Sequence, residues 1–131
     1  MFSNHTFRNL VFLLVAILFL TACSSPEQGA VQAVESYLQA LVDKDQDRLL
    51  ASICPAWETD ALLELDALSL IETTLSDLTC AQTGSEEDVA LVVCQGSIDA
   101  TYGTEIQKFD LGQRTFLVIP SGTDFLVCGY R

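Results

Sequence analysis

The sequence predicts an α+β domain in which N-terminal helices pack on one face of a four-stranded antiparallel meander. Apolar residues recur at three- and four-residue spacing over residues 29–68, as on one face of a helix. Over residues 71–130 the pattern changes to two-residue alternation and β-branched runs, which are typical of strands. Helices followed by strands, rather than alternating with them, indicate an α+β fold, and 131 residues suffice for one domain.

Three helices are expected before the sheet. The first spans residues 29–42, whose apolar side chains share one face. Asp45 is a suitable N-cap for a second helix over residues 46–53, because its side chain can accept hydrogen bonds from free backbone N–H groups. Pro55 ends that helix, since the residue before a proline is pushed out of the helical region. The third helix is expected over residues 56–68.

Four strands should follow the helices: residues 71–82, 89–102, 104–119 and 123–130. Gly, Ser and acidic residues form the first turn over residues 83–88, Gly103 marks the second, and residues 120–122 form the third. The first strand is expected to be irregular near Ser76 and Asp77. Gly112 is a point at which the third strand could be interrupted.

Residues 1–22 have the layout of a secretory signal peptide. A short polar start carries Arg8, an unbroken apolar run covers residues 10–20, and the small residues Thr21 and Ala22 lead to Cys23. A membrane-spanning helix needs about 20 apolar residues, so this run is shorter than a permanent span. The pattern predicts export and cleavage rather than a retained membrane helix.

The segment Leu20-Thr21-Ala22-Cys23 resembles the lipobox of bacterial lipoproteins. In that family a diacylglycerol is joined to the cysteine sulfur, the signal is cut before the cysteine, and the new N-terminus is acylated. The resemblance implies that Cys23 is lipidated, that residues 23–28 hold it on a short tether, and that the protein lies on the cell membrane, facing outside the cytoplasm. Two or three acyl chains anchor stably. The alternative is an ordinary secreted protein.

Composition excludes several classes of function. Cleavage would remove His5, the only histidine, and with it the most common general base and metal ligand. Ser–His and Cys–His nucleophilic sites both need an imidazole, so they are excluded. A net charge of −12 argues against nucleic acid as a partner, since its phosphates are bound by Lys and Arg. We expect no metal and no cofactor.

Four cysteines remain after Cys23, and they are expected to form two disulfides: Cys54, Cys80, Cys94 and Cys128. An even number of cysteines in a small exported domain is typical of a disulfide framework. Structural zinc sites usually contain close Cys-x-x-Cys pairs, which are missing here. Sequence alone leaves three pairings open. We favour Cys80–Cys94 with Cys54–Cys128, because Cys80 and Cys94 should lie on neighbouring strands.

The segments VQAVESYLQALVDKD and RLLASICP look like the opening of a nuclear-transport-factor-two-like, or cystatin-like, domain. The ending FLVIPSGTDFLVCGY looks like the final hairpin of small bacterial lipoproteins in that group, and the LTC and VVC segments fit it. The resemblance covers nearly all of residues 29–130. It implies that residues 29–131 form a cone-shaped domain with a curved sheet, and it implies no particular chemistry.

Acidic stretches are interpreted as solvated surface. Residues 43–47 begin like a calcium-binding EF-hand loop, but Arg48 and Cys54 stand where that loop needs Gly and Glu, which favours a helix cap. Four acids of the third helix are interpreted as its solvated face: Glu58, Asp60, Glu64 and Asp66. The alternative is that Asp60 and Glu64, four residues apart, share a cation.

The leading functional hypothesis is a non-catalytic, lipid-anchored binding or interaction domain. A concave sheet face covered by helices can hold a small apolar ligand. The candidate pocket residues are aromatic and are interpreted first as members of the core, with a ligand pocket as the alternative: Tyr37, Trp57, Phe109 and Phe116. A third hypothesis is an accessory subunit that binds an envelope protein through an apolar patch on the outer face of the sheet.

The second hypothesis is a carboxylate-based isomerase or hydratase. It requires Asp99 or Asp110 in an apolar cavity, where desolvation raises the pKa of a carboxyl group, and Tyr102 as a hydrogen-bond donor. The alternative is that these strand acids face outward, with Arg114 paired to one of them.

Overall fold

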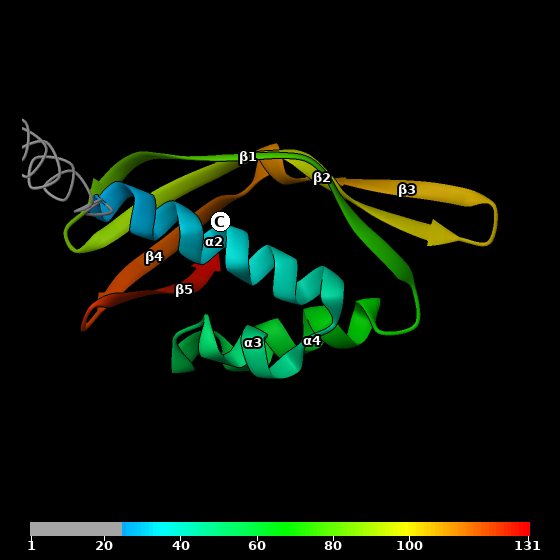
Figure 1. Ribbon diagram of the computed structural model, residues 1–131, viewed down its shortest axis with the longest axis horizontal. Coiled ribbons are helices and arrows are strands. Elements are labelled where there is room, and N and C mark those ends of the chain that lie inside the picture. Colours follow the sequence, from blue (N-terminus) through cyan, green and yellow to red (C-terminus); the bar gives the residue numbers. More distant parts are fainter. Residues whose placement is uncertain (1–24) are drawn as a thin grey trace, which may run out of the picture.

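The computed structural model describes residues 25–131, so the predicted signal peptide, the lipobox and Cys23 lie outside the described residues. The described chain has an α+β fold, in which the helices come first and an open antiparallel sheet of five strands follows (Figure 1). Among the described helices, none combines the length and the apolar character needed to cross a membrane.

Helix α2 (Pro26–Asp43) begins three residues before the predicted start at residue 29. Ser25 and Gln28 form a capping box: the Ser25 hydroxyl accepts from the Gln28 backbone N–H at 3.3 Å, and the Gln28 side chain accepts from the Ser25 N–H at 3.1 Å. Pro26 suits the first helical position because it has no N–H to satisfy. The last three residues of the predicted tether, 26–28, are therefore helical.

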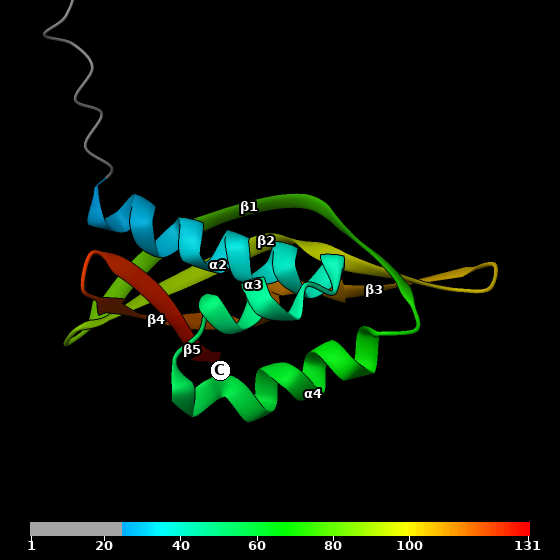
Figure 2. The same cartoon turned by 60° about the horizontal axis from the view of Figure 1, so that its bottom comes forward.

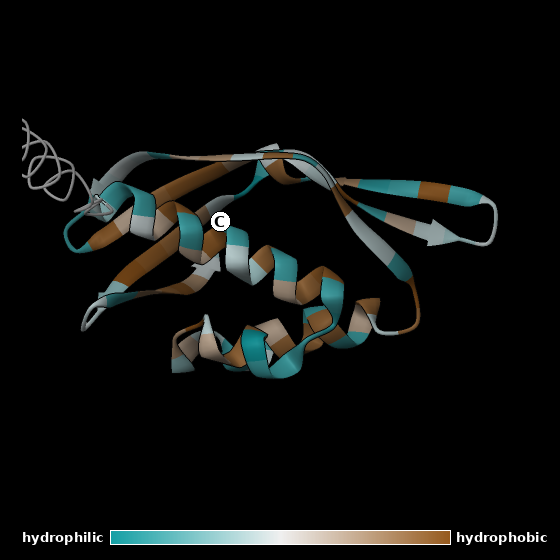
Figure 3. Ribbon diagram, viewed as in Figure 1, coloured by the Kyte–Doolittle hydropathy of each residue, from teal (hydrophilic) through white to brown (hydrophobic). Residues whose placement is uncertain are grey.

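The apolar face of α2 packs into the core, and hydrophobic and hydrophilic bands alternate along this helix (Figure 3). Its main buried side chains are Ala30, Val34, Tyr37, Leu38 and Leu41. The helix contacts strands from both halves of the sheet, and the two views show it crossing one sheet face (Figures 1 and 2). Burial of this single face fixes the helix against the sheet.

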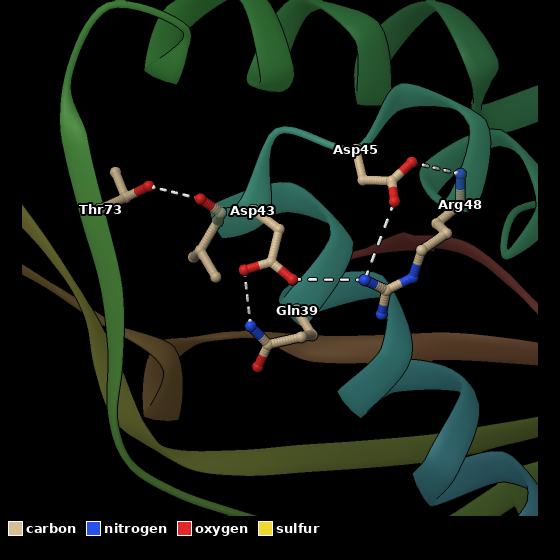
Figure 4. A network of polar contacts seen from close by, with 6 residues as sticks. Gln39, Asp43, Asp45, Arg48 and Thr73 are labelled. Carbon is tan, nitrogen blue, oxygen red and sulfur yellow. Dashed lines mark hydrogen bonds and ion pairs between the residues drawn. The ribbon is translucent and has the colours of Figure 1, made fainter.

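An acidic corner joins α2 to helix α3 (Gln46–Ala51) (Figure 4). Lys44 ends α2 in the left-handed conformation, with φ 57°. Asp45 caps α3, because its Oδ1 accepts from the Arg48 backbone N–H at 3.1 Å, and the Arg48 guanidinium lies 3.3 Å from Asp43. The helix-cap interpretation of this stretch is confirmed.

The third predicted helix is two elements. A 3-10 turn, η2 (Pro55–Trp57), leads directly into helix α4 (Glu58–Leu68). Helix α3 ends at Ala51, two residues before the predicted end at residue 53. In Figure 2, α4 lies below α2 and α3, on the side of the sheet that α2 covers.

The prediction of four strands is wrong, because the expected third strand is two; the interruption that the sequence indicated at Gly112 is confirmed. The strands are β1 (Glu72–Glu86), β2 (Val89–Tyr102), β3 (Glu105–Asp110), β4 (Thr115–Ser121) and β5 (Asp124–Tyr130). A 3-10 turn, η3 (Leu111–Gln113), separates β3 from β4. The Asp110 carboxylate accepts from the Gly112 N–H at 2.8 Å, and Leu111 turns fully into the core. These two contacts stabilise the break.

Strand β2 is the central strand. Strand β1 pairs with it on one side, while β4 pairs with Ala90–Val93 and β3 with Ser97–Tyr102 on the other. The sheet order is β1-β2-β4-β5, with β3 beside the second half of β2. Residues 97–110 form the β2–β3 hairpin at one end of the sheet, called the β2–β3 arm below (Figure 1), and residues 72–76 of β1 pair with the other edge of its β2 strand.

Strand β1 is irregular where the sequence predicted. Its register with β2 shifts between Ser76 and Thr79, and Asp77 has φ 54°. Gly96 lies opposite with φ 103°, and a Cβ there would collide with the Ser76 carbonyl oxygen, so the bulge requires glycine. The strand runs on to Glu86, four residues beyond its predicted end.

Two disulfides are formed, in the pairing that we favoured from the sequence: Cys54–Cys128 and Cys80–Cys94. The first joins the segment after α3 to β5, with 5.2 Å between the Cα atoms. The second joins two directly paired residues of β1 and β2.

A buried hydrogen bond connects β1 to the end of α2. The Thr73 hydroxyl donates to the Val42 carbonyl at 2.9 Å (Figure 4).

Different elements lie at the two ends of the long axis of the domain. The N-terminus of α2 and the β4–β5 hairpin lie at one end of the long axis, and the β2–β3 arm lies at the other (Figures 1 and 2). The C-terminal turns of α4 point toward the arm end.

Candidate functional site

A cavity of about 200 Å³ lies between α4 and the β2–β3 arm. Its lining side chains come from α2, α4, β2, β3 and the residue before β4: Leu41, Glu64, Ala67, Leu68, Ile98, Tyr102, Phe109 and Arg114. Most of these are apolar, and the two charged residues come from different elements. Apolar walls with a few converging polar groups are the usual form of a small-molecule site.

Glu64 is the best-connected charged side chain at this cavity. Its Oε2 accepts from the Tyr37 hydroxyl at 2.5 Å, and its Oε1 accepts from the Tyr130 hydroxyl. The Arg114 guanidinium lies 3.7 Å from the same Oε1. The Glu64 side chain is only 21% exposed, which contradicts its assignment to the solvated face of the helix. Its contacts come from α2, from β5 and from the residue between η3 and β4, so this carboxylate holds α4, α2 and the end of the sheet together.

Arg114 stands between η3 and β4, and the break in the predicted third strand places it there. Its guanidinium lies over the ring of Tyr130, 4.2 Å from the centroid, which is a cation–π contact. The expectation that Arg114 pairs with Asp99 or Asp110 is wrong, since its ion-pair partner within residues 25–131 is Glu64. The side chain is 25% exposed and lines the cavity.

The two tyrosines at Glu64 are held in their neutral form. Burial raises the pKa of Tyr37 above its usual value, and the nearby charge of Glu64 raises it further. Burial, followed by the hydrogen bond to Glu64, raises the pKa of Tyr130 to about 12. Both hydroxyls therefore keep their protons near neutral pH, so that in each of these hydrogen bonds the tyrosine donates and the Glu64 carboxylate accepts.

Of the four predicted pocket aromatics, Phe109 lines the cavity. Tyr37 reaches the site only through Glu64, and Phe116 is fully buried behind it, between the rings of Tyr37 and Tyr130. Trp57 packs edge-on against Tyr130, 5.5 Å between centroids, and its indole N–H donates to the Tyr37 hydroxyl at 3.4 Å. These three residues support the network rather than line the hollow.

The three residues of the isomerase hypothesis do not come together. Asp99 accepts from the Ser97 hydroxyl, from Lys108 Nζ at 2.9 Å and from the Ser76 hydroxyl at 2.8 Å. These hydrogen bonds, that from Ser97 first, lower the pKa of Asp99 to about 2, which makes it a poor general base. Asp110 caps η3, and Tyr102 alone lines the cavity.

Glu64 and Arg114 are the site residues that the sequence reasoning missed. Glu64 lies three residues after Ala61 and four before Leu68, both of which belong to the buried side of α4 or pack against it. An acid at that spacing lies beside an apolar stripe, and this was the available signal. The position of Arg114 depends on the break at η3, for which Gly112 was the available signal, since an interruption of the strand was expected there.

Two wider hollows lie elsewhere. One, of about 670 Å³, runs between the first half of α2 and the β4–β5 hairpin, and the other, of about 480 Å³, lies between α2 and β1. Neither brings a carboxylate and a guanidinium together, so they offer less basis for selecting a ligand.

The described surface also has four exposed large apolar side chains: Leu63, Leu70, Tyr102 and Ile106. Leu63 is on α4, Leu70 follows α4, and the other two are on the β2–β3 arm. Within residues 25–131, no group of three or more His, Cys, Asp or Glu side chains is placed to hold a metal ion.

The chain was compared with known proteins at the levels of family, sequence and structure. No protein-family model matches it, and neither the curated proteins nor the solved structures contain a match.

Proposed function

We propose that this chain is a non-catalytic, lipid-anchored binding domain outside the cytoplasm, which takes a small and largely apolar ligand in the cavity beside Glu64 and Arg114. The cavity is the observation that supports ligand binding. Its apolar walls favour an apolar body, and its two charged groups are prepositioned by tyrosines at one place in the wall.

Export and anchoring are supported by two separate features. The segment Leu20-Thr21-Ala22-Cys23 supports lipidation at Cys23. The two disulfides support an oxidising compartment, because such bonds are rare where thiols are kept reduced. We further propose that the domain is a cystatin-like cone, since α2 crosses one face of an antiparallel sheet as that resemblance implies.

The absence of catalysis is proposed on the state of the carboxylates. The Glu64 carboxylate already accepts hydrogen bonds from two tyrosine hydroxyls. The lowered pKa of Asp99 makes its carboxylate a weak base. The isomerase hypothesis needs a carboxyl group free to exchange a proton with substrate. The accessory-subunit hypothesis has no specific observation in its favour among the described residues.

Anchoring is tested with Cys23→Ser in the producing cell. We expect the unaltered chain to incorporate labelled fatty acid and to sediment with membranes, because acyl chains on Cys23 hold it there. The variant should lose the label. Ser24→Ala is the matched control and should keep both properties. A Cys23→Ser chain that still carries the label would contradict the assignment.

Ligand binding is tested on the chain from residue 23 onward, exported by an ordinary cleavable signal and carrying Cys23→Ser so that no lipid competes. The probe is ethylbenzene, and binding is followed by NMR shifts of the protein. Ala67→Phe should abolish binding, because Ala67 lines the cavity. Thr59→Phe, an exposed substitution on the same helix that does not line the cavity, should leave it unchanged. Equal binding by both variants would place the ligand elsewhere.

A further inference from the structure

The guanidinium of Arg114 has hydrogen-bonding capacity that the described chain does not use. A guanidinium carries five N–H donors. Its distance of 3.7 Å to Glu64 Oε1 is that of an ion pair and is too long for a hydrogen bond. The contact with Tyr130 involves the ring face and consumes no donor. Since the side chain lines the cavity, its donors are available to a molecule bound there.

The charge balance of the cavity favours a neutral molecule. Arg114 and Glu64 compensate each other, and the Glu64 oxygens already accept two tyrosine hydroxyls. An anionic ligand would add an unbalanced charge among apolar side chains, close to Glu64, in a chain of net charge −12. A cationic ligand would face the Arg114 guanidinium at short range. A neutral acceptor avoids both costs.

The size of the cavity sets the size of the part of the ligand that it encloses. An apolar cavity of about 150 Å³ holds one benzene molecule. The volume of about 200 Å³ here fits a single ring with a short substituent. Leu41, Ile98 and Phe109 provide apolar walls for such a ring.

We propose that the ligand is a neutral, single-ring molecule with one acceptor oxygen of the carbonyl type, and that Arg114 donates to this oxygen. The inference rests on the proposed function, because it names the ligand class of the same cavity. The hydrogen bond from Arg114 distinguishes this ligand class from others, because a hydrocarbon of the same shape would fill the apolar part of the cavity equally well. Arg114 thus selects the ligand, while the apolar walls supply its burial.

The test compares acetophenone with ethylbenzene, which has a similar shape and no acceptor, on the exported Cys23→Ser chain. The measured quantity is the ratio of the two dissociation constants, determined by NMR titration. A hydrogen bond to a charged group contributes about 1.5 kcal/mol or more. Arg114→Met should therefore weaken the binding of acetophenone about tenfold relative to that of ethylbenzene. Lys108→Met, which removes an exposed cation outside the cavity, should leave the ratio unchanged.

Benzoate and benzylamine are the charged probes, and both should bind more weakly than acetophenone. An unchanged ratio in Arg114→Met would overturn the role of Arg114, and tighter binding of benzoate would overturn the neutral class. If Arg114→Met fails to fold, the order of the four probes on the chain with Arg114 intact still decides the ligand class. If acetophenone and ethylbenzene bind equally well, the inference fails while the proposed function stands. If no probe binds to a chain that unfolds cooperatively, the proposed function itself fails.

Discussion

Removing the Tyr37 hydroxyl should destabilise the domain by about 2 kcal/mol, the usual size of a hydrogen bond to a charged group. The substitution is Tyr37→Phe, which keeps the buried ring and removes only the oxygen that donates to Glu64 at 2.5 Å. The indole N–H of Trp57 loses its acceptor at the same time. For a domain of this length, the loss corresponds to a fall in Tm of roughly 10 °C.

A double-mutant cycle assigns this energy to the pair. In Glu64→Ala the fully buried Tyr37 hydroxyl keeps its place but loses its acceptor, which costs about 1–3 kcal/mol beyond the lost hydrogen bond of Tyr130. In the double variant Tyr37→Phe/Glu64→Ala this penalty disappears, because the hydroxyl is gone. We therefore expect a coupling energy of about 2 kcal/mol between the two positions.

The assay is equilibrium unfolding in urea, followed by the fluorescence of Trp57, the only tryptophan of the chain. The slope with denaturant should stay constant across the cycle while the midpoint moves. Tyr102→Phe, at a hydroxyl that is not part of the network, should change stability by less than about 0.5 kcal/mol. A coupling energy near zero would refute the reasoning, because the network would then stabilise nothing.

Three further outcomes are expected. The Asp99 carboxyl should titrate at about 2 by NMR, so its contribution to stability is present above its unfolded pKa and is lost as the pH falls toward 2; Lys108→Gln should move the titration upward. Tyr130 should ionise only near pH 12 when followed by ultraviolet absorbance, and its contribution to the free energy of unfolding should be lost between its unfolded pKa of about 10 and that pH. An absorbance step near pH 10 that disappears in Tyr130→Phe would contradict this. Replacing both cysteines of Cys54–Cys128 by alanine should cost about 1.5 kcal/mol more in urea unfolding than replacing Cys80–Cys94, because the loops span 74 and 14 residues; an equal loss would show that loop entropy does not decide.

Elements whose pattern is local could be predicted from the sequence. The start and end of β2 follow from its β-branched run and the flanking turns, and the disulfide pairing follows from the adjacency of two strands. The N-cap at Asp45 is also a local signal, since the side chain bonds within its own helix turn. Each of these depends on residues close in sequence or on the simplest strand order.

The site could not be predicted in the same way, because it depends on contacts between distant segments. The carboxylate of Glu64 is buried by residues from α2 and β5, 27 and 66 positions away. Helical periodicity alone described this side chain as solvated. Gly112 marked the place of the break at η3, but the sequence alone could not decide between one interrupted strand and two, because this depends on the burial of Leu111 in the core. Candidate residues that were chosen by residue type alone, such as Asp99, therefore do not line the cavity.

The bond between Cys80 and Cys94 has a consequence for how β1 finds its place. These residues face each other directly, in the stretch of β1 that lies between its two register shifts. A strand slipped by one position would turn its side chains to the opposite face and move the two sulfur atoms apart. Formation of the Cys80–Cys94 bond therefore favours the correctly aligned hairpin over one slipped by a single position.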